Sequence, residues 1–344
     1  MKKGRFWALL GALWFILGGL FPAEGLCAAN TYSPSLPLLL LSEENFVWVC
    51  YSPYHRTQKP SDRFCFTDDD ILFDLQKIAE AKFVYFRTYG LENCQSKIVT
   101  LGKSHFPQLK IYLGVSVRNT CRDNPHDDHC TMWQLNEAIR LANAYDNVVG
   151  VVVGNECLED PAISGNDPVS ADNLIEYLLY VKNNLQPARR AMVRVTTCFS
   201  WYAAVDAQGY PKFGEKIKPY CDVIMINAFP FWAGKPIEEA RENFLWAWRE
   251  IHRPHRYGPD ARQGKQIIIG ETGWPSQGSC VGSACPSPAN EQKYIYDIVS
   301  EARAKGIPVF LFEMFDEPWK TAEGSFGPYW GLYDKNGNPK FPLP

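Results

Sequence analysis

The sequence lacks several features that mark common classes of protein. Its 344 residues have a formal net charge of −3 and no cluster of basic residues, which disfavours binding to nucleic-acid phosphates. No Gly-rich nucleotide-binding loop follows the first apolar strand, and no interdomain linker or low-complexity tract divides the chain. Beyond residue 21, no apolar run is long enough to span a membrane. These absences leave a single enzyme or binding domain as the simplest interpretation.

The N-terminus has the order of charge and hydrophobicity typical of a secretory signal peptide. Basic residues among the first five are followed by an apolar run at residues 6–21 and by small residues at 27–29. We predict cleavage after residue 29, a lead-in at residues 30–44 and one domain from residue 45 to 344. An uncleaved membrane anchor is the alternative, but the apolar run is shorter than the ~20 residues that span a bilayer. We therefore expect a secreted or otherwise extracytoplasmic protein without membrane attachment.

The cysteine count agrees with export. Eleven cysteines become ten once Cys27 leaves with the signal peptide, an even number that allows up to five disulfides in an oxidising compartment. The shortest candidate loops are Cys121–Cys130 and Cys280–Cys285, and the remaining pairing stays open.

The segment at residues 121–130 also contains two histidines and several aspartates, which would suit zinc or calcium. Its spacing matches no standard zinc pattern, so we favour a polar loop closed by a disulfide and expect no metal.

Eight apolar, β-branched runs are spaced along the chain and alternate with polar loops and helical patterns. They read as continuous hydrophobic segments, as expected of parallel strands that are buried on both faces. We predict a single (β/α)₈ TIM barrel, with a doubly wound open sheet as the alternative. Thr67 should cap one helix, and another should begin after Ser287 and stop at Gly306. The eight runs begin near Phe46, Phe83, Leu109, Val148, Val193, Val223, Ile267 and Pro308.

Two of these strands end on a glutamate. Residues 151–156 (VVVGNE) end the fourth strand at Glu156, and residues 266–271 (QIIIGE) end the seventh at Glu271. A single such glutamate is equally consistent with a helix cap or an ion pair with an arginine, but two in matching contexts favour catalysis. Two carboxylates facing one cleft suit glycoside hydrolysis, and a separation of about 5–5.5 Å would make it retaining.

Other residues at strand ends are candidates for contacts with a sugar. Asn155 is placed to donate a hydrogen bond to a sugar 2-hydroxyl, although a turn role is the alternative. Arg87 either holds the nucleophile ionised or forms a structural ion pair. Asn227, Trp201 and Trp274 lie in or beside loops of the same face, where each indole either stacks on a sugar ring or packs in the wall.

At this level of detail the chain resembles glycoside hydrolase family 17, the β-1,3-glucanases of clan A. Residues 270–276 (GETGWPS) resemble that family's signature, and residues 153–156 (VGNE) resemble its acid/base motif. The segments 51–54 (YSPY), 87–89 (RTY) and 312–320 (FEMFDEPWK) are similar to the bacterial and fungal branch. The resemblance spans about residues 46–333.

The resemblance implies Glu156 as acid/base, Glu271 as nucleophile, and Glu317 with Lys320 as a charged pair near the acid. It implies a retaining mechanism on a β-glucan without metal or organic cofactor, in a protein that we expect to be monomeric. A glucanosyltransferase would use the same carboxylates, and a binding protein that has lost catalysis is the alternative from another class. Cys157 and the insertion at 119–130 depart from the plant enzymes and leave endo or exo action open. Further contacts with the substrate are expected from Tyr51, Tyr89 and Glu313.

Overall fold

The computed structural model describes residues 46–118, 126–158, 169–201, 216–251 and 264–344. The predicted signal peptide, the lead-in and the pairing of Cys121 with Cys130 involve residues outside these ranges. They stay predictions.

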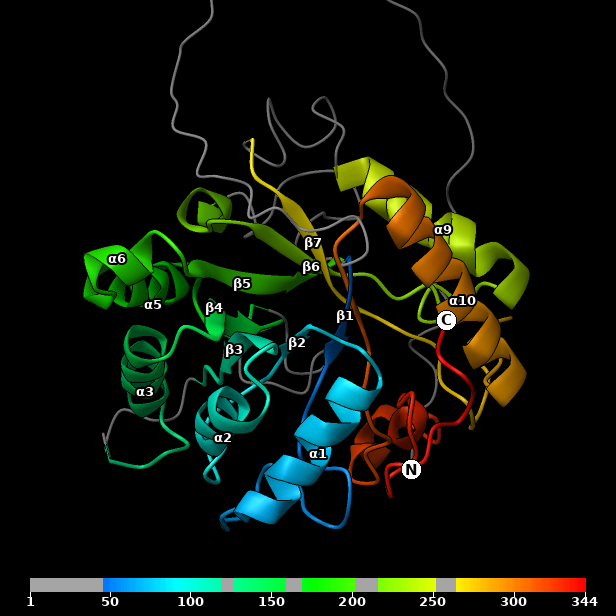
Figure 1. Cartoon of the computed structure of the whole chain (residues 1–344). Coiled ribbons are helices and arrows are strands. Elements are labelled where there is room, and N and C mark those ends of the chain that lie inside the picture. Colours follow the sequence, from blue (N-terminus) through cyan, green and yellow to red (C-terminus); the bar gives the residue numbers. More distant parts are fainter. Residues whose placement is uncertain (1–45, 119–125, 159–168, 202–215, 252–263) are drawn as a thin grey trace, which may run out of the picture. The chain divides into compact units, whose positions relative to one another are not determined.

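Eight parallel strands close into a barrel, which confirms the predicted (β/α)₈ fold (Figure 1). Each strand pairs with the next along the chain, and β8 pairs with β1 to complete the closure. Every polar end of a parallel strand therefore faces the same mouth of the barrel. The strands are β1 (Val47–Cys50), β2 (Tyr85–Arg87), β3 (Lys110–Val115), β4 (Val148–Asn155), β5 (Arg194–Ser200), β6 (Ile224–Asn227), β7 (Ile267–Thr272) and β8 (Val309–Leu311).

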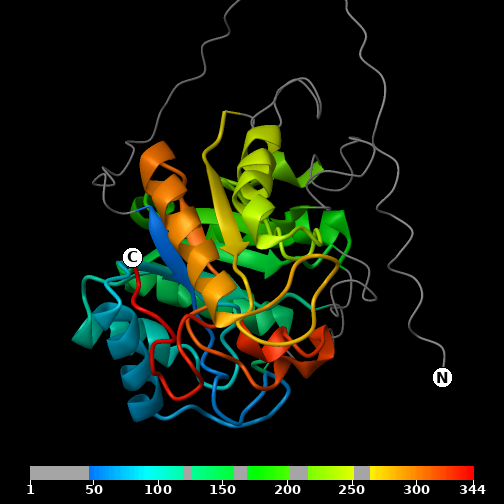
Figure 2. The same ribbon diagram turned by 90° about the vertical axis from the view of Figure 1, so that its right-hand side faces the viewer.

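Helices surround the barrel, and α9 and α10 lie side by side outside its last strands (Figures 1 and 2). None of the described helices is both long and apolar enough to cross a membrane. The helices are α1 (Asp68–Glu80), α2 (Lys97–His105), α3 (Thr131–Ala144), α5 (Ala171–Asn184), α6 (Pro187–Arg190), α9 (Ile237–Ile251) and α10 (Pro288–Lys305), with the 3₁₀ turns η1 (Lys218–Tyr220), η2 (Lys320–Glu323) and η3 (Gly327–Tyr329).

The predicted helix ends are confirmed. The Thr67 side chain accepts from the backbone N–H of Asp70, and the Asp70 side chain accepts from the Thr67 N–H, which forms a capping box. Ser287 caps α10, whose first residue is Pro288. Gly306 ends α10 in the left-handed conformation, with φ of 63°.

The barrel interior has its own apolar cluster, separate from the core between strands and helices. Trp48 of β1 stacks on Tyr112 of β3 and meets the Phe310 ring of β8 edge-on at 4.9 Å. Contacts between strands that are not neighbours show that these side chains point into the barrel. They fill its lower layers, as in other barrels of this type, and leave the polar layer above them for the site.

Two disulfides join described cysteines. The predicted pair Cys280–Cys285 is confirmed, and a second bond joins Cys65 to Cys94. The upper limit of five disulfides is wrong, because three cysteines of the described ranges are free, buried thiols: Cys50, Cys198 and Cys221.

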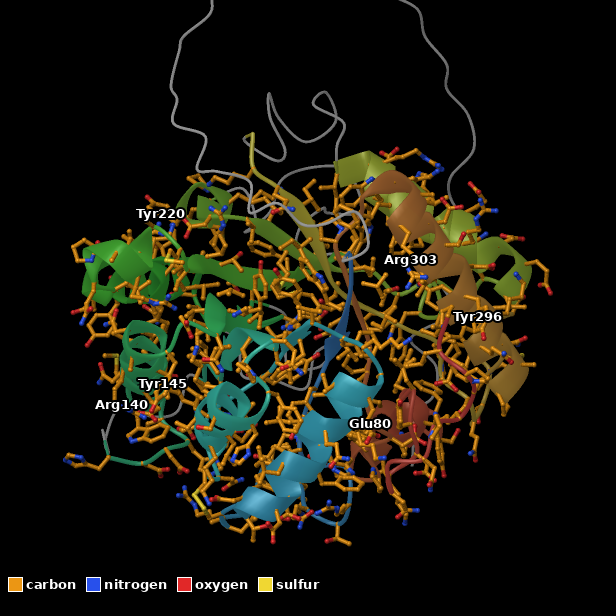
Figure 3. The ribbon with its side chains drawn as sticks, in the orientation of Figure 1. Glu80, Arg140, Tyr145, Tyr220, Tyr296 and Arg303 are labelled. Carbon is orange, nitrogen blue, oxygen red and sulfur yellow. A yellow bond between two sulfur atoms is a disulfide. The ribbon has the colours of Figure 1, made fainter. Side chains whose placement is uncertain are left out.

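The C-terminal segment packs back onto the barrel. Tyr296 and Arg303, both labelled on α10 in Figure 3, donate to the carbonyl oxygens of Pro342 and Pro344. Lys340 reaches further inward, where its ammonium group lies 2.7 Å from Asp316 and 3.3 Å from Glu291. The tail is thus tied to α10 and to the loop that follows β8.

A buried histidine ties the same segment to α1. His55 Nε2 lies 2.9 Å from Asp74 Oδ1, and its Nδ1 lies 2.8 Å from the Lys335 carbonyl oxygen. Both ring nitrogens face acceptors, so the protonated ring satisfies both contacts. Burial disfavours that charge, but the hydrogen bond and the charge of Asp74 outweigh it and raise the pKa of His55, against a smaller opposing effect of Arg56.

A raised pKa in the folded state makes the stability depend on pH. The contribution of His55 is full below the ordinary histidine pKa of about 6.5 and is lost as pH rises through the folded-state value. We expect His55→Gln to lower the free energy of unfolding by about 2 kcal/mol at pH 6, because hydrogen bonds of a charged group are lost. Denaturant unfolding at pH 6 and pH 9 measures the free energy of unfolding of both proteins. Between these pH values the variant should lose less of this free energy than the wild type. Equal losses would contradict the assignment.

Candidate active site

The two predicted carboxylates lie at the same mouth of the barrel. Glu271 is in β7 and 5% exposed, and Glu156 directly follows β4 and is half-buried. The register pairs Asn227 of β6 with Glu271 and Cys198 of β5 with Asn155, so the ends of β4 to β7 lie at one level. Parallel closure therefore brings together residues that are more than a hundred positions apart.

The backbone at the end of β4 is irregular. The pairing with β5 shifts between Val152 and Asn155, and both Gly154 (φ 76°) and Glu156 (φ 51°) have left-handed backbones. This conformation disfavours a residue with a side chain, so Glu156 is held in it by its surroundings. Its N–H donates to the Cys198 carbonyl oxygen at 2.9 Å.

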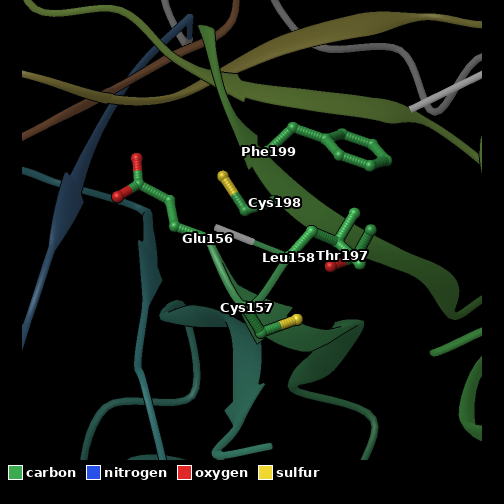
Figure 4. A pocket seen from close by; sticks show the side chains of 6 residues that line it. All are labelled: Glu156, Cys157, Leu158, Thr197, Cys198 and Phe199. Atoms are coloured by element: carbon green, nitrogen blue, oxygen red, sulfur yellow. The ribbon is translucent and has the colours of Figure 1, made fainter. Parts of the chain in front are cut away.

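Figure 4 shows how the side chains lie at this irregular end of β4. The Glu156 carboxylate points away from the Cys157 thiol, and residues 156–158 line a small pocket together with residues 197–199 of β5.

Arg87, the last residue of β2, is fully buried and points across the site. It donates to the Gly270 carbonyl oxygen at 3.0 Å and to Asn155 Oδ1 at 2.9 Å. Its guanidinium lies 3.5 Å from Glu271 Oε1. Of the two predicted roles, this geometry favours stabilisation of the Glu271 charge.

Tyr89 makes the shortest contact to Glu271. Its hydroxyl donates to Glu271 Oε1 at 2.8 Å, and its ring centroid lies 4.8 Å from the Arg87 guanidinium. Burial raises the pKa of Glu271, and Arg87, Tyr89, Lys320 and Asn155 oppose this without cancelling it. These neighbours therefore limit the rise in pKa that burial causes and favour the carboxylate form of Glu271.

Asn227 holds the other carboxylate. Its amide nitrogen lies 2.7 Å from Glu156 Oε1 and 3.3 Å from Asn155 Oδ1. Contacts thus run without a break from Glu271 through Arg87, Asn155 and Asn227 to Glu156, and we call this series the hydrogen-bond chain. Asn155, the last residue of β4, lies at its centre and contacts the groups that hold both carboxylates. Its predicted hydrogen bond to a sugar 2-hydroxyl stays a prediction.

A buried charged cluster lies beyond β8. The Lys320 ammonium is 2.7 Å from Glu313 and 2.9 Å from Glu317, and all three side chains are buried. Burial, together with the charge of Glu317, raises the pKa of Glu313 despite the neighbouring Lys320. The positive charge of Lys320 also opposes the rise in the pKa of Glu271. The expected position of Glu317 and Lys320 near the acid stays a prediction.

Two residues that were expected to contact the sugar are instead packed inside the protein. Trp274 is fully buried, donates to the Cys285 carbonyl oxygen and packs on Phe231 at 5.2 Å. Tyr51 is also fully buried and donates to Asp74. Neither ring has a face open to a ligand, so both predictions are corrected to structural roles. Trp201 is half-buried at the end of β5 and packs against Trp246.

The structure adds residues that the sequence analysis missed. Phe229 and Phe312 are half-buried, meet edge-to-face at 5.5 Å, and lie next to the charged cluster, with Lys320 over the Phe312 ring. Cys198 lies 2.9 Å from Asn227 and 3.3 Å from Arg87. Phe229 was visible in the sequence as the second residue after Asn227, but nothing local distinguished it from wall packing.

Residues 49–331 match the model of the BtgE/BtgC glycoside hydrolase domain. The chain belongs to this glycoside hydrolase family. This agrees with the resemblance to glycoside hydrolase family 17, and the matched range contains Glu156, Glu271 and the whole hydrogen-bond chain. In the described ranges, no group of three or more His, Cys, Asp or Glu side chains is arranged to hold a metal ion.

Named relatives are fungal. The probable glucan endo-1,3-β-glucosidase btgC of Aspergillus fumigatus is 30% identical over 274 residues, which are 74% of this chain and 36% of that protein. The chain thus spans about a third of that relative. A glucan 1,3-β-glucosidase of Arthroderma benhamiae is 28% identical over 74% of this chain and 78% of its own.

Among solved structures, an active-site mutant of Rhizomucor miehei β-1,3-glucanosyltransferase in complex with laminaritriose shares the fold. The TM-score is 0.66 at 23% identity, over 88% of this chain and 98% of that one.

The Tyr89 contact predicts how activity depends on pH. Tyr89→Phe removes a hydrogen bond that stabilises the Glu271 carboxylate, so the pKa of Glu271 should rise further. We expect the acidic limb of kcat/KM on an aryl glycoside to move to higher pH, with activity at pH 5 lowered about tenfold. Tyr296→Phe, which removes a surface hydrogen bond on α10, is the matched control. An unmoved acidic limb in Tyr89→Phe would remove Tyr89 from this role.

Proposed function

We propose that the protein is a retaining glycoside hydrolase that cleaves β-1,3-glucosidic bonds of β-glucans by double displacement. The observation that carries the proposal is the pair Glu156 and Glu271 at one barrel mouth, joined by the hydrogen-bond chain. The relatives named as glucan 1,3-β-glucosidases support the choice of substrate.

The surroundings of the two carboxylates assign their roles. Glu271 faces a guanidinium and a phenol donor, and Lys320 adds a second positive charge, so these three neighbours favour its ionised form and oppose the rise in pKa that burial causes. Glu156 receives a hydrogen bond from the neutral amide of Asn227. Positive neighbours, as at Glu271, suit a group that must be ionised. A neutral hydrogen-bond donor, as at Glu156, suits a group that must gain and lose a proton. Glu271 is accordingly the nucleophile and Glu156 the acid/base.

The reaction then follows in two steps. Glu271 attacks the anomeric carbon while Glu156 gives its proton to the departing glycosidic oxygen, which leaves a glycosyl ester on Glu271 and a carboxylate at Glu156. Glu156 next takes a proton from water, whose oxygen attacks the anomeric carbon and releases Glu271. Two inversions restore the β configuration. Arg87 and Tyr89 stabilise the charge of Glu271 before the first step and after the second.

The half-buried aromatic rings near the site suit the substrate. Phe229 and Phe312 lie beside the charged cluster, and Trp201 directly follows β5 at the same mouth of the barrel. Aromatic faces bind the apolar faces of glucosyl rings, while the nearby polar groups bind hydroxyls. These three rings are the proposed stacking residues: Trp201 was already a candidate, and Phe229 and Phe312 take the place of Trp274.

The same proposal extends to location and assembly. Two disulfides among the described cysteines support an extracytoplasmic protein. We propose that the secreted chain acts as a monomer, because all members of the hydrogen-bond chain come from one barrel.

Linear β-1,3-gluco-oligosaccharides test the function directly. The wild type should shorten these chains, and its first products should have the β configuration. Mass spectrometry measures the chain length of the products, and NMR of the anomeric protons measures their configuration. Glu271→Ala and Glu156→Ala should each lower turnover at least about a thousandfold, because each removes a reacting group. Azide should restore Glu156→Ala on an activated aryl glucoside as the β-azide. Glu80→Gln, an exposed change on α1, is the control.

Each alternative has its own outcome in the same experiment. Chains longer than the starting oligosaccharide would identify a glucanosyltransferase that passes the glycosyl ester to a sugar hydroxyl. First products of α configuration would contradict the retaining mechanism. A folded wild type without turnover would overturn the β-1,3-glucan assignment.

A further inference from the structure

A buried thiol lies between the two halves of the site. Cys198 of β5 is 1% exposed, and its side chain belongs to the apolar cluster inside the barrel. Its Sγ lies 2.9 Å from Asn227 Oδ1 and 3.3 Å from a terminal nitrogen of Arg87. The sulfur therefore touches the residue that holds Glu156 and the residue that stabilises Glu271.

The partners of Asn227 fix which way its amide points. One end of the amide faces Glu156 Oε1 and Asn155 Oδ1, and Asn155 Oδ1 already accepts from Arg87. Two acceptors require the NH₂ group at that end, so the carbonyl oxygen must face the other way. There it meets Cys198, whose S–H is a donor, while the sulfur accepts from Arg87.

The neighbouring backbone leaves room for this contact. A Cβ at Gly270 would lie 2.4 Å from Cys198 Sγ and 2.9 Å from Asn227 Oδ1, distances that no real Cβ adopts. The residue before the nucleophile thus has no side chain at the point where the thiol meets the amide. Burial also raises the pKa of the Cys198 thiol, against the opposing effect of Arg87, which keeps the proton on sulfur.

We propose that Cys198 is a positioning residue that orients the Asn227 amide toward Glu156 and so holds the acid/base in place. The inference rests on the proposed function of Glu156. Without the S–H donor, the Asn227 carbonyl oxygen has lost its partner and the amide is free to turn. Its NH₂ group then no longer fixes the Glu156 carboxyl beneath the departing oxygen.

Cys198→Ala tests this through reactions that differ in their need for an acid. We expect kcat/KM for β-1,3-gluco-oligosaccharides to fall about tenfold, because protonation of a poor leaving group requires a positioned acid. For dinitrophenyl β-glucoside, kcat/KM should fall less than about twofold, because this leaving group departs without a proton. The basic limb of the oligosaccharide profile should move to higher pH, since a donor to the Glu156 carboxylate has been lost.

Further variants separate positioning from packing. Cys198→Ser retains a donor and should recover most of the lost kcat/KM, whereas Cys198→Val fills the space without a donor and should resemble alanine. In an Asn227→Ala background, Cys198→Ala should have no additional effect, because the thiol acts through that amide. Cys221→Ala removes a free buried thiol whose hydrogen bond goes to the Ile217 carbonyl oxygen, and it is the matched control.

The outcomes distinguish this inference from the proposed function. A wild type without turnover on either substrate would overturn the function itself. If the wild type is active, three results for Cys198→Ala would each contradict the positioning role. These are an equal loss of activity on both substrates, an unmoved basic limb of the pH profile, and activity equal to that of Cys198→Ser. If the alanine variant does not fold, the serine and valine variants carry the same comparison.

Discussion

The buried charge of Arg87 is the constraint on which the site depends. An ion at the bottom of a barrel mouth is destabilised by several kcal/mol unless its donors are satisfied and a negative charge lies nearby. Arg87 meets most of these needs through its terminal nitrogens, with the Gly270 carbonyl oxygen, the Asn155 side chain and the Glu271 carboxylate, while its Nε has no hydrogen-bond partner among the described residues. The same contacts that stabilise the guanidinium also fix Glu271, the proposed nucleophile, and Asn155, which precedes the proposed acid/base.

This solution requires the closed barrel. The partners of Arg87 on β2 come from β4, β5 and β7, and none of those strands is a sequence neighbour or a pairing partner of β2. Only closure, with every strand parallel, points all four ends at one another across the axis. The apolar layers below, built from Trp48, Tyr112 and Phe310, support that closure and keep water from the underside of the site. Fold stability and catalytic geometry are therefore coupled.

Local patterns predicted much of this arrangement. Continuous apolar runs marked all eight strands, and the polar residue that ends each run identified Arg87, Asn227, Glu156 and Glu271. Burial of individual side chains was not predictable, because parallel strands are apolar on both faces and alternation does not reveal which residues point inward. For this reason the inward thiol of Cys198 was missed, and the fully packed Trp274 was mistaken for a stacking residue. Aromatic residues at loop starts have the same sequence pattern in either role.

The backbone of Glu156 shows how the remaining geometry is achieved. A regular end to β4 would place successive side chains on opposite faces of the strand, so Asn155 and Glu156 would not serve the same site. The register shift and the left-handed residues Gly154 and Glu156 break that alternation and bring both side chains into the hydrogen-bond chain. Left-handed backbone at a glutamate costs of order 1 kcal/mol or more, and the Cys198 carbonyl and the Asn227 amide offset it. The strain is thus located at Glu156, the proposed acid/base, and contacts with β5 and β6 hold this residue in place.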